Sequence, residues 1–269
     1  MMLGDTKNGI TTLRFASLSG CDHGFSTRAG GVSDTPFAAL NMGFNRPEPR
    51  ENIIENYHRF CAANGLEFES MVLAAYAHGT NVEVITKNDR GRGIDPDLPP
   101  LNTCDGLVTN DPDTVLLTLH ADCLAYFVFD PVHQAIGLAH AGWRGTLGRI
   151  GRNLIETMSK NYGTFARDVL VGIGPGICGE CYEVGEDVAD SFEAEYGASV
   201  VTRFAESNPH IDITAASRLQ FSECGVPAEN ISTADCCTHE NESLFFSYRR
   251  DGKIWGKTGA MCAYMRLRG

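Results

Sequence analysis

Two histidines and a cysteine in the middle of the chain have side chains that could bind a metal ion. His78 follows the apolar segment 72–76, Cys123 comes shortly after segment 115–119, and His140 comes directly after segment 134–139. Imidazole and thiolate are ligands that Zn²⁺ accepts in tetrahedral sites. Three protein ligands would leave a fourth position open for water, which is the arrangement of a catalytic site rather than a structural one.

The spacing of these residues leaves alternatives open, because they lie far apart in sequence, unlike the ligands of a zinc finger. Without a metal, the two histidines would be hydrogen-bonded polar residues and Cys123 a small core residue. A cysteine hydrolase is also possible, with Cys123 as nucleophile and His140 or His78 as base. Asp122 could carry a proton for the site, although in a strand it would face away from Cys123.

A rival group of soft ligands occurs later in the chain. It contains five residues in two short segments: Cys178, Cys181, Cys236, Cys237 and His239. A structural zinc site or a redox pair are both conceivable here.

Composition excludes several classes of protein. The net charge of −12 makes nucleic acid an unexpected partner, since an acidic surface repels phosphate backbones. Residues 1–15 do not resemble a signal peptide, and no apolar run reaches the roughly 20 residues of a membrane helix. We therefore expect a cytoplasmic protein without a membrane partner, whose ten cysteines do not form a disulfide framework.

The elements that must position these residues follow from the apolar patterns. Helical spacing predicts helices at residues 50–64, 146–161, 186–196 and 214–224. Short apolar runs predict strands at residues 72–76, 82–86, 106–109, 115–119, 125–130, 134–139, 169–173, 231–234, 244–248 and 261–267. Asp130-Pro131 predicts a hairpin turn, and residues 88–103, with three Pro and two Gly, predict a long surface loop.

No linker or internal repeat divides the chain. Strands dominate the middle, and helices are interspersed among them without a regular strand–helix–strand series. The sequence therefore predicts one domain over residues 1–269, of the α/β (mixed α+β) class with mixed sheets.

Several longer motifs make the chain recognisable. In order, they are His23-Gly24-Phe25-Ser26-Thr27-Arg28-Ala29-Gly30-Gly31, Leu40-Asn41-Met42-Gly43, Ala121-Asp122-Cys123, His140-Ala141-Gly142-Trp143-Arg144-Gly145, Cys181-Tyr182-Glu183-Val184-Gly185 and Phe245-Phe246-Ser247-Tyr248-Arg249-Arg250-Asp251-Gly252. Together they resemble the YfiH family, also called DUF152 or the multicopper polyphenol oxidase (laccase-like) family.

The resemblance implies a single-domain layered sandwich of mixed β-sheets with flanking helices. It also implies that His78, Cys123 and His140 bind Zn²⁺. The implied activity is phosphorolysis of the purine nucleosides adenosine, inosine and methylthioadenosine, together with adenosine deamination. The older family name implies Cu²⁺ and phenol oxidation instead. In the family pattern, Cys181 and Cys237 are motif residues that need no metal.

Phosphorolysis needs cations that hold phosphate. Arg28, Arg144 and Arg249 or Arg250 lie in the motif segments, and guanidinium groups match phosphate oxygens well. Thr258-Gly259-Ala260 stands where the family has Thr-Gly-Arg, so one cation of the pattern is missing. Trp143 and Tyr182 could stack on a base or belong to the core. A non-catalytic ligand-binding module is a further alternative, and the sequence indicates no protein partner.

Overall fold

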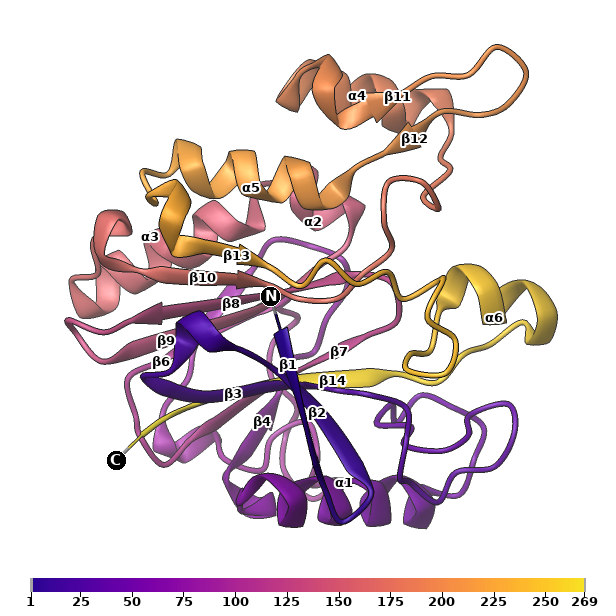
Figure 1. Ribbon diagram of the computed structural model, residues 1–269. Helices are drawn as coiled ribbons and strands as arrows, with labels where there is room; N and C mark the ends of the chain where they lie inside the picture. Colours follow the sequence, from indigo (N-terminus) through magenta and orange to yellow (C-terminus); the bar gives the residue numbers. More distant parts are fainter. Residues whose placement is uncertain (1, 269) are drawn as a thin grey trace.

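Two six-stranded sheets lie face to face and form the middle of the molecule (Figure 1). The computed structural model describes residues 2–268. Helix α1 covers the outer face of one sheet, and α3 and α5 cover the outer face of the other, so the protein is a four-layered sandwich. This architecture confirms the expected mixed α/β fold.

The first sheet contains both termini of the described chain. Its neighbours are antiparallel except for the parallel pair at one edge formed by β7 and β4. In spatial order its strands are β1 (Met2–Lys7), β2 (Ile10–Phe15), β3 (Cys21–Ser26), β14 (Met261–Leu267), β7 (Val115–His120) and β4 (Met71–Leu73).

The second sheet comes mostly from the middle of the chain. It is antiparallel in the centre and has a parallel pair at each edge. Its strands, in spatial order, are β13 (Ile231–Thr233), β10 (Leu170–Ile173), β8 (Leu124–Asp130), β9 (Ala135–Ala141), β6 (Gly106–Thr109) and β5 (Val82–Val84). A separate ribbon pairs β11 (Val201–Thr202) with β12 (His210–Ile211).

Six α-helices surround the sheets within residues 2–268. They are α1 (Arg50–Asn64), α2 (Trp143–Leu147), α3 (Ile150–Tyr162), α4 (Glu186–Tyr196), α5 (Ile213–Glu223) and α6 (Tyr248–Trp255). Helix α3 packs on β9 through Leu154 and Met158, and Gly137 makes this close approach possible. A Cβ at Gly137 would lie 3.1 Å from Leu154 and 3.0 Å from the Met158 sulfur. None of the helices within residues 2–268 is long and apolar enough to cross a bilayer.

Most predicted elements are present, with two corrections. The predicted helix 146–161 is two helices, because the chain breaks at Gly148 and Arg149, whose φ of 62° is left-handed. The predicted strand 244–248 is wrong: Phe245 and Phe246 are buried outside any strand, and Ser247 caps α6 by accepting a hydrogen bond from the Arg250 amide at 3.2 Å. Strands β1–β3, β11 and β12 and helix α6 were not predicted.

Two segments that cross from the first sheet to the second contain candidate site residues. The segment after β4 of the first sheet leads to β5 of the second, and the turn after β7 of the first leads to β8 of the second. His78 lies in the first crossing and Cys123 in the second. His140 lies in β9, which pairs with β8. The fold therefore brings the three residues to one end of the interface between the sheets.

Candidate active site

His78, Cys123 and His140 converge in the folded chain. One ligand atom of each, either an imidazole nitrogen or the thiol sulfur, lies within 4.8 Å of the other two. His140 is buried, with 3% of its surface exposed, whereas His78 is accessible. Two nitrogens and one sulfur at this separation match the donor set and size of a zinc site with one side open.

Asp105 holds His140 and the backbone around His78 in place through hydrogen bonds. Its carboxylate accepts hydrogen bonds from the amides of Ala77, His78 and Gly79 at 3.1, 2.9 and 2.7 Å. The same carboxylate accepts the Nδ1 proton of His140 at 3.0 Å. With Nδ1 held by Asp105, Nε2 of His140 faces the cluster, so Asp105 fixes both the orientation of this ring and the loop that carries His78.

The electrostatics of the cluster favour negative charge on the thiol and on Asp105. Burial acts to raise the pKa of Cys123, but the charge of His140 and hydrogen bonds from both histidines outweigh it and lower the pKa. Burial also acts to raise the pKa of Asp105, and the hydrogen bonds from His140 and the backbone amides reverse that effect. An anionic thiol is what both metal binding and nucleophilic attack require.

Space for an ion is kept open by Gly142, which follows β9. A Cβ at this position would lie 3.1 Å from the Cys123 sulfur and 3.2 Å from the His78 ring. Any larger residue would therefore push into the volume in front of the three ligand atoms.

His120 supports Cys123 from the end of β7. Its Nδ1 donates to the Cys123 carbonyl at 3.1 Å, and its Nε2 accepts from the Thr118 hydroxyl at 2.7 Å. Burial lowers the pKa of His120 well below the usual value, so the ring is neutral and supports the backbone at Cys123. Its ring nitrogens are engaged by these partners, and it is not part of the ligand group.

The cluster lies in a cavity of about 570 Å³. Four aromatic side chains line it: Tyr76, Trp143, Tyr182 and Tyr248. This volume is in the range of small-molecule sites, and a few polar groups among aromatic walls are typical of such sites.

Three arginines also line the cavity: Arg46, Arg144 and Arg249. The guanidinium of Arg144 lies 4.1 Å from the Trp143 ring centre, and that of Arg249 lies 5.3 Å from the Tyr182 ring centre. Each therefore stacks on an aromatic wall beside the cluster. Arg46, which lies on the loop between the Leu40-Asn41-Met42-Gly43 motif and α1, was not predicted as a site residue.

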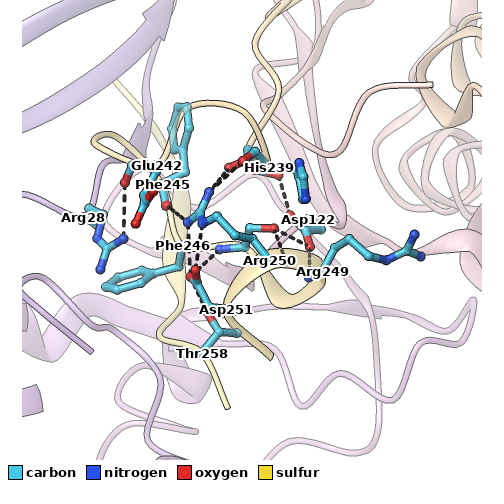
Figure 2. A network of polar contacts seen from close by, with 12 residues as sticks. Arg28, Asp122, His239, Glu242, Phe245, Phe246, Arg249, Arg250, Asp251 and Thr258 are labelled. Carbon is cyan, nitrogen blue, oxygen red and sulfur yellow. Dashed lines mark hydrogen bonds and ion pairs between the residues drawn. The ribbon is translucent and has the colours of Figure 1, made fainter. Parts of the chain in front are cut away.

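The structure does not bring Arg28 into this cavity. Arg28 donates to the carbonyls of Ala38 at 2.8 Å and Glu242 at 3.2 Å, and its guanidinium stacks on Phe246. Figure 2 shows Arg28 and Arg249 at opposite ends of one polar network. Arg250 is also occupied, because it pairs with Asp251 and donates to the Phe245 carbonyl.

Asp122 lines the cavity, but both of its carboxylate oxygens are engaged (Figure 2). Oδ1 accepts from the Thr238 hydroxyl at 2.6 Å, and Oδ2 accepts from the Ser247 hydroxyl at 3.0 Å and the Arg249 amide at 2.7 Å. Asp122 has a left-handed φ of 83°, which lets it follow β7 while Cys123 faces the histidines. The carboxylate thus fastens the first turn of α6, and with it Arg249, to the cavity wall.

Fold and cavity together define a mixed α/β protein with a His/Cys/His group in the lining of a pocket that also contains three arginines. Residues 22–268 match the family described as multi-copper polyphenol oxidoreductase laccase, and the chain belongs to this family.

Named relatives extend this result. The chain is 38% identical over 263 residues to a protein of Deinococcus radiodurans named purine nucleoside phosphorylase, covering 97% of this chain and 95% of that protein. The structure of this chain is similar to that of YlmD from Geobacillus stearothermophilus, with a TM-score of 0.92, 32% identity and 98% of each chain covered. It is also similar to the Bacillus licheniformis protein YfiH, with a TM-score of 0.91, 28% identity and 97% of each chain covered. The expected YfiH resemblance is confirmed.

Proposed function

We propose that this protein is a zinc-dependent purine nucleoside phosphorylase that also deaminates adenosine. The observation that carries the proposal is the convergence of His78, Cys123 and His140 within 4.8 Å at the base of an arginine-lined cavity. The relative named purine nucleoside phosphorylase, which this chain matches over almost its full length, supports the substrate class.

The residues present fit Zn²⁺. One thiolate and two imidazoles are a borderline-soft donor set, Asp105 holds one imidazole in the tautomer that binding needs, and Gly142 leaves the space free. Zinc held there would supply a Lewis acid that polarises substrate oxygen and activates water for deamination.

Substrate binding falls to side chains around the cluster. In our proposal, Arg144 and Arg249 hold the phosphate, because guanidinium forks pair with phosphate oxygens and both groups are already stacked in place. Arg46 contributes a third positive charge at the cavity. Trp143 and Tyr182 provide flat apolar surfaces for the purine or ribose of adenosine, inosine or methylthioadenosine.

In our proposal, Asp122 orients α6 and does not transfer a proton. Three donors already occupy its carboxylate, so moving a proton would break the contacts that hold Ser247 and Arg249. We therefore propose that Asp122 positions α6. The kinetics of the variant Asp122→Asn separate this role from acid–base catalysis.

Turnover of defined substrates tests the proposal. Purified protein is incubated with adenosine, inosine or methylthioadenosine, with and without phosphate, and the products are separated by chromatography. We expect free base and the sugar 1-phosphate (ribose 1-phosphate, or 5-methylthioribose 1-phosphate from methylthioadenosine) only when phosphate is present, and inosine from adenosine in either case. His78→Ala should abolish both phosphorolysis and deamination, whereas His133→Ala, at a half-exposed histidine paired with Asp130, should not. Absence of all these products would exclude the proposed function.

A cysteine hydrolase is a second candidate because His140 hydrogen-bonds to Asp105 on one side and to Cys123 on the other, as in a carboxylate–base–nucleophile triad. In this alternative no metal is bound and Cys123 itself attacks the substrate. Iodoacetamide distinguishes the two: rapid alkylation of Cys123 in protein that carries its full metal content favours the hydrolase, and protection by the metal favours coordination.

Copper-dependent phenol oxidation is the activity in the family description. Multicopper oxidation needs several copper ions, and this chain has eight histidines in total. Elemental analysis decides the matter: stoichiometric copper together with oxidation of a phenolic dye would favour this activity over the zinc enzyme.

A further inference from the structure

A second group of possible metal ligands lies beside the cavity wall, outside the His78, Cys123 and His140 cluster. The sulfurs of Cys178, Cys181 and Cys237 and a carboxylate oxygen of Glu240 all lie within 4.8 Å of one another. The sequence analysis identified soft ligands in this part of the chain, but the structure brings only some of them together. Cys236 and His239 fall outside the group, and Glu240 joins it.

Two tight turns present these four side chains at the same spacing. In the first turn the Cys181 amide donates to the Cys178 carbonyl at 3.1 Å, and in the second the Asn241 amide donates to the Cys237 carbonyl at 3.2 Å. Each turn thus offers two ligands three residues apart, Cys178 with Cys181 and Cys237 with Glu240. Paired turns of this kind are how structural zinc sites collect four ligands.

Hydrogen bonds to backbone carbonyls also hold the two turns in place. The Thr238 amide donates to the Gly176 carbonyl at 3.0 Å. Arg250 donates to the Thr238 carbonyl at 3.1 Å and to the His239 carbonyl at 2.8 Å. Figure 2 shows Arg250 beside His239. These contacts order the backbone of the second turn independently of an ion, which reduces the ordering cost of binding.

Contacts inside the group resemble those around a metal-bound sulfur. The Cys178 amide donates to the Cys237 sulfur at 3.3 Å, and the Cys181 sulfur donates to Glu240 Oε1 at 3.7 Å. The second contact links two groups that an ion would bind directly. Three sulfurs and one carboxylate supply four ligands and leave no open position, which is the composition of a structural rather than a catalytic site.

We propose that Cys178, Cys181, Cys237 and Glu240 bind one structural Zn²⁺. On binding, each thiol releases its proton to the solvent and the carboxylate completes the tetrahedron. The ion joins the segment 176–182 to the segment 237–241. Ile177 and Tyr182 of the first segment line the cavity, and Thr238 of the second donates to Asp122. The site therefore stabilises one wall of the candidate active site.

Metal stoichiometry tests this site. Protein stripped by a chelator and dialysed is titrated with zinc alone, and the bound metal is measured by elemental analysis. We expect two equivalents in the wild type, one in the double variant Cys178→Ser/Cys181→Ser, and one in His78→Ala. Cys236→Ser is the matched control, since it neighbours Cys237 but lies outside the group, and it should retain two equivalents. Should the first site bind no zinc, the wild type would hold one equivalent and the double variant none, so the two proposals fail independently.

Cobalt substitution reports on the ligands themselves. Thiolate-to-cobalt charge-transfer absorption should come mainly from the three-sulfur site, persist in His78→Ala and disappear in the double variant. Glu240→Gln changes an exposed side chain and keeps the fold, and it should weaken zinc binding at this site while leaving the other site filled. Equal zinc content in the wild type and the double variant would overturn the proposal. So would a Cys178–Cys181 disulfide, found by mass spectrometry of alkylated protein, because it would make the group a redox pair.

Discussion

Asp105 is the residue on which the geometry of the candidate metal centre depends most. One buried carboxylate accepts four N–H groups, three from the backbone around His78 and one from the His140 ring. No sequence pattern marks this role, because His140 lies 35 residues away and the contact exists only after β6 and β9 have paired. The convergence of His78, Cys123 and His140 agrees with the sequence analysis, in which each follows an apolar segment.

Asp105→Asn should weaken zinc binding by about 10–100-fold, the range typical for loss of a group that orients a ligand. The amide has only one acceptor oxygen, so it cannot serve both His140 and the backbone amides. Zinc affinity is measured by competition with a chromophoric chelator, alongside turnover. Asp130→Asn is the matched control: Asp130 is equally buried and pairs with His133 at 2.9 Å, away from the cavity. If both variants bind zinc like the wild type, Asp105 has no orienting role.

Asp122→Asn separates positioning from proton transfer. If the carboxylate fastens α6, its loss should raise the KM for phosphate, leave kcat within a few fold and preserve the metal content. The reason is that Arg249 would lose the amide contact of 2.7 Å that fixes its place. Steady-state kinetics over a range of pH give the result. A collapse of kcat with unchanged KM, and loss of one limb of the pH profile, would instead identify Asp122 as the proton carrier.

At the scale of elements, α6 shows why sequence reasoning identified the converging residues His78, Cys123 and His140 better than the arginines that line the cavity. The segment 244–248 was predicted as a strand because it is apolar and aromatic. Its real conformation is decided by the Ser247 cap and by Asp122, more than a hundred residues earlier in the chain. Strands β1–β3 escaped prediction for a related reason: β1 is almost wholly exposed, and β3 contains Asp22, His23 and Gly24. Local patterns carry no information about such partners.

The arginines of different elements should behave differently. Arg249→Ala removes a cation from the cavity and should raise the KM for phosphate by roughly tenfold or more, since hydrogen bonds to charged groups contribute about 1.5–3 kcal/mol. Arg28→Ala should lower the melting temperature and leave that KM unchanged, because Arg28 holds the Ala38 and Glu242 carbonyls instead. Kinetics and thermal melts of both variants give the comparison. A raised phosphate KM in Arg28→Ala would show that this residue reaches the substrate after all.

Strand β3 gives the fold a dependence on pH through His23. The ring accepts a hydrogen bond from the Phe15 amide at 2.9 Å and packs against Phe15 and Phe127. Burial lowers the pKa of His23 from 6.5 to about 4, and the contact with the Cys21 carbonyl only partly offsets this. Between these two values the unfolded chain binds a proton that the folded chain does not, so stability is full above pH 6.5 and is lost as the pH falls toward 4.

The free energy of unfolding should therefore fall by about 3 kcal/mol between pH 6.5 and 4 through His23 alone, at about 1.4 kcal/mol per pKa unit. Urea denaturation at several pH values measures the slope. His23→Gln should flatten it, whereas His58→Gln, at an exposed position on α1, should not. His120, whose pKa burial also lowers, accounts for part of the slope that remains. An unchanged slope in His23→Gln would contradict this origin.

At the scale of the whole molecule, the site lies where the chain crosses between the two sheets. One apolar core fills the interface between the sheets and contains side chains of both, including Phe25, Leu116, Phe127 and Leu138. Each sheet therefore buries its inner face against the other. This shared core supports our proposal that the chain is a single domain. The layered architecture could be expected from the family resemblance, but the crossings could not, because they depend on which sheet each strand joins.

Zinc should stabilise the whole protein rather than one part of it. His78 and Cys123 belong to separate crossings and His140 to the second sheet, so an ion bound to all three joins both sheets and binds only the folded chain. Such binding raises stability by about 2.7 kcal/mol when free zinc is 100 times its dissociation constant. Calorimetry of metal-free protein should show one unfolding transition that moves to higher temperature as zinc is added. In His78→Ala the shift should shrink to the part contributed by the Cys178, Cys181, Cys237 and Glu240 site. Two separate transitions would contradict a single cooperative domain, and an equal shift in His78→Ala would show that zinc does not join the sheets at this cluster.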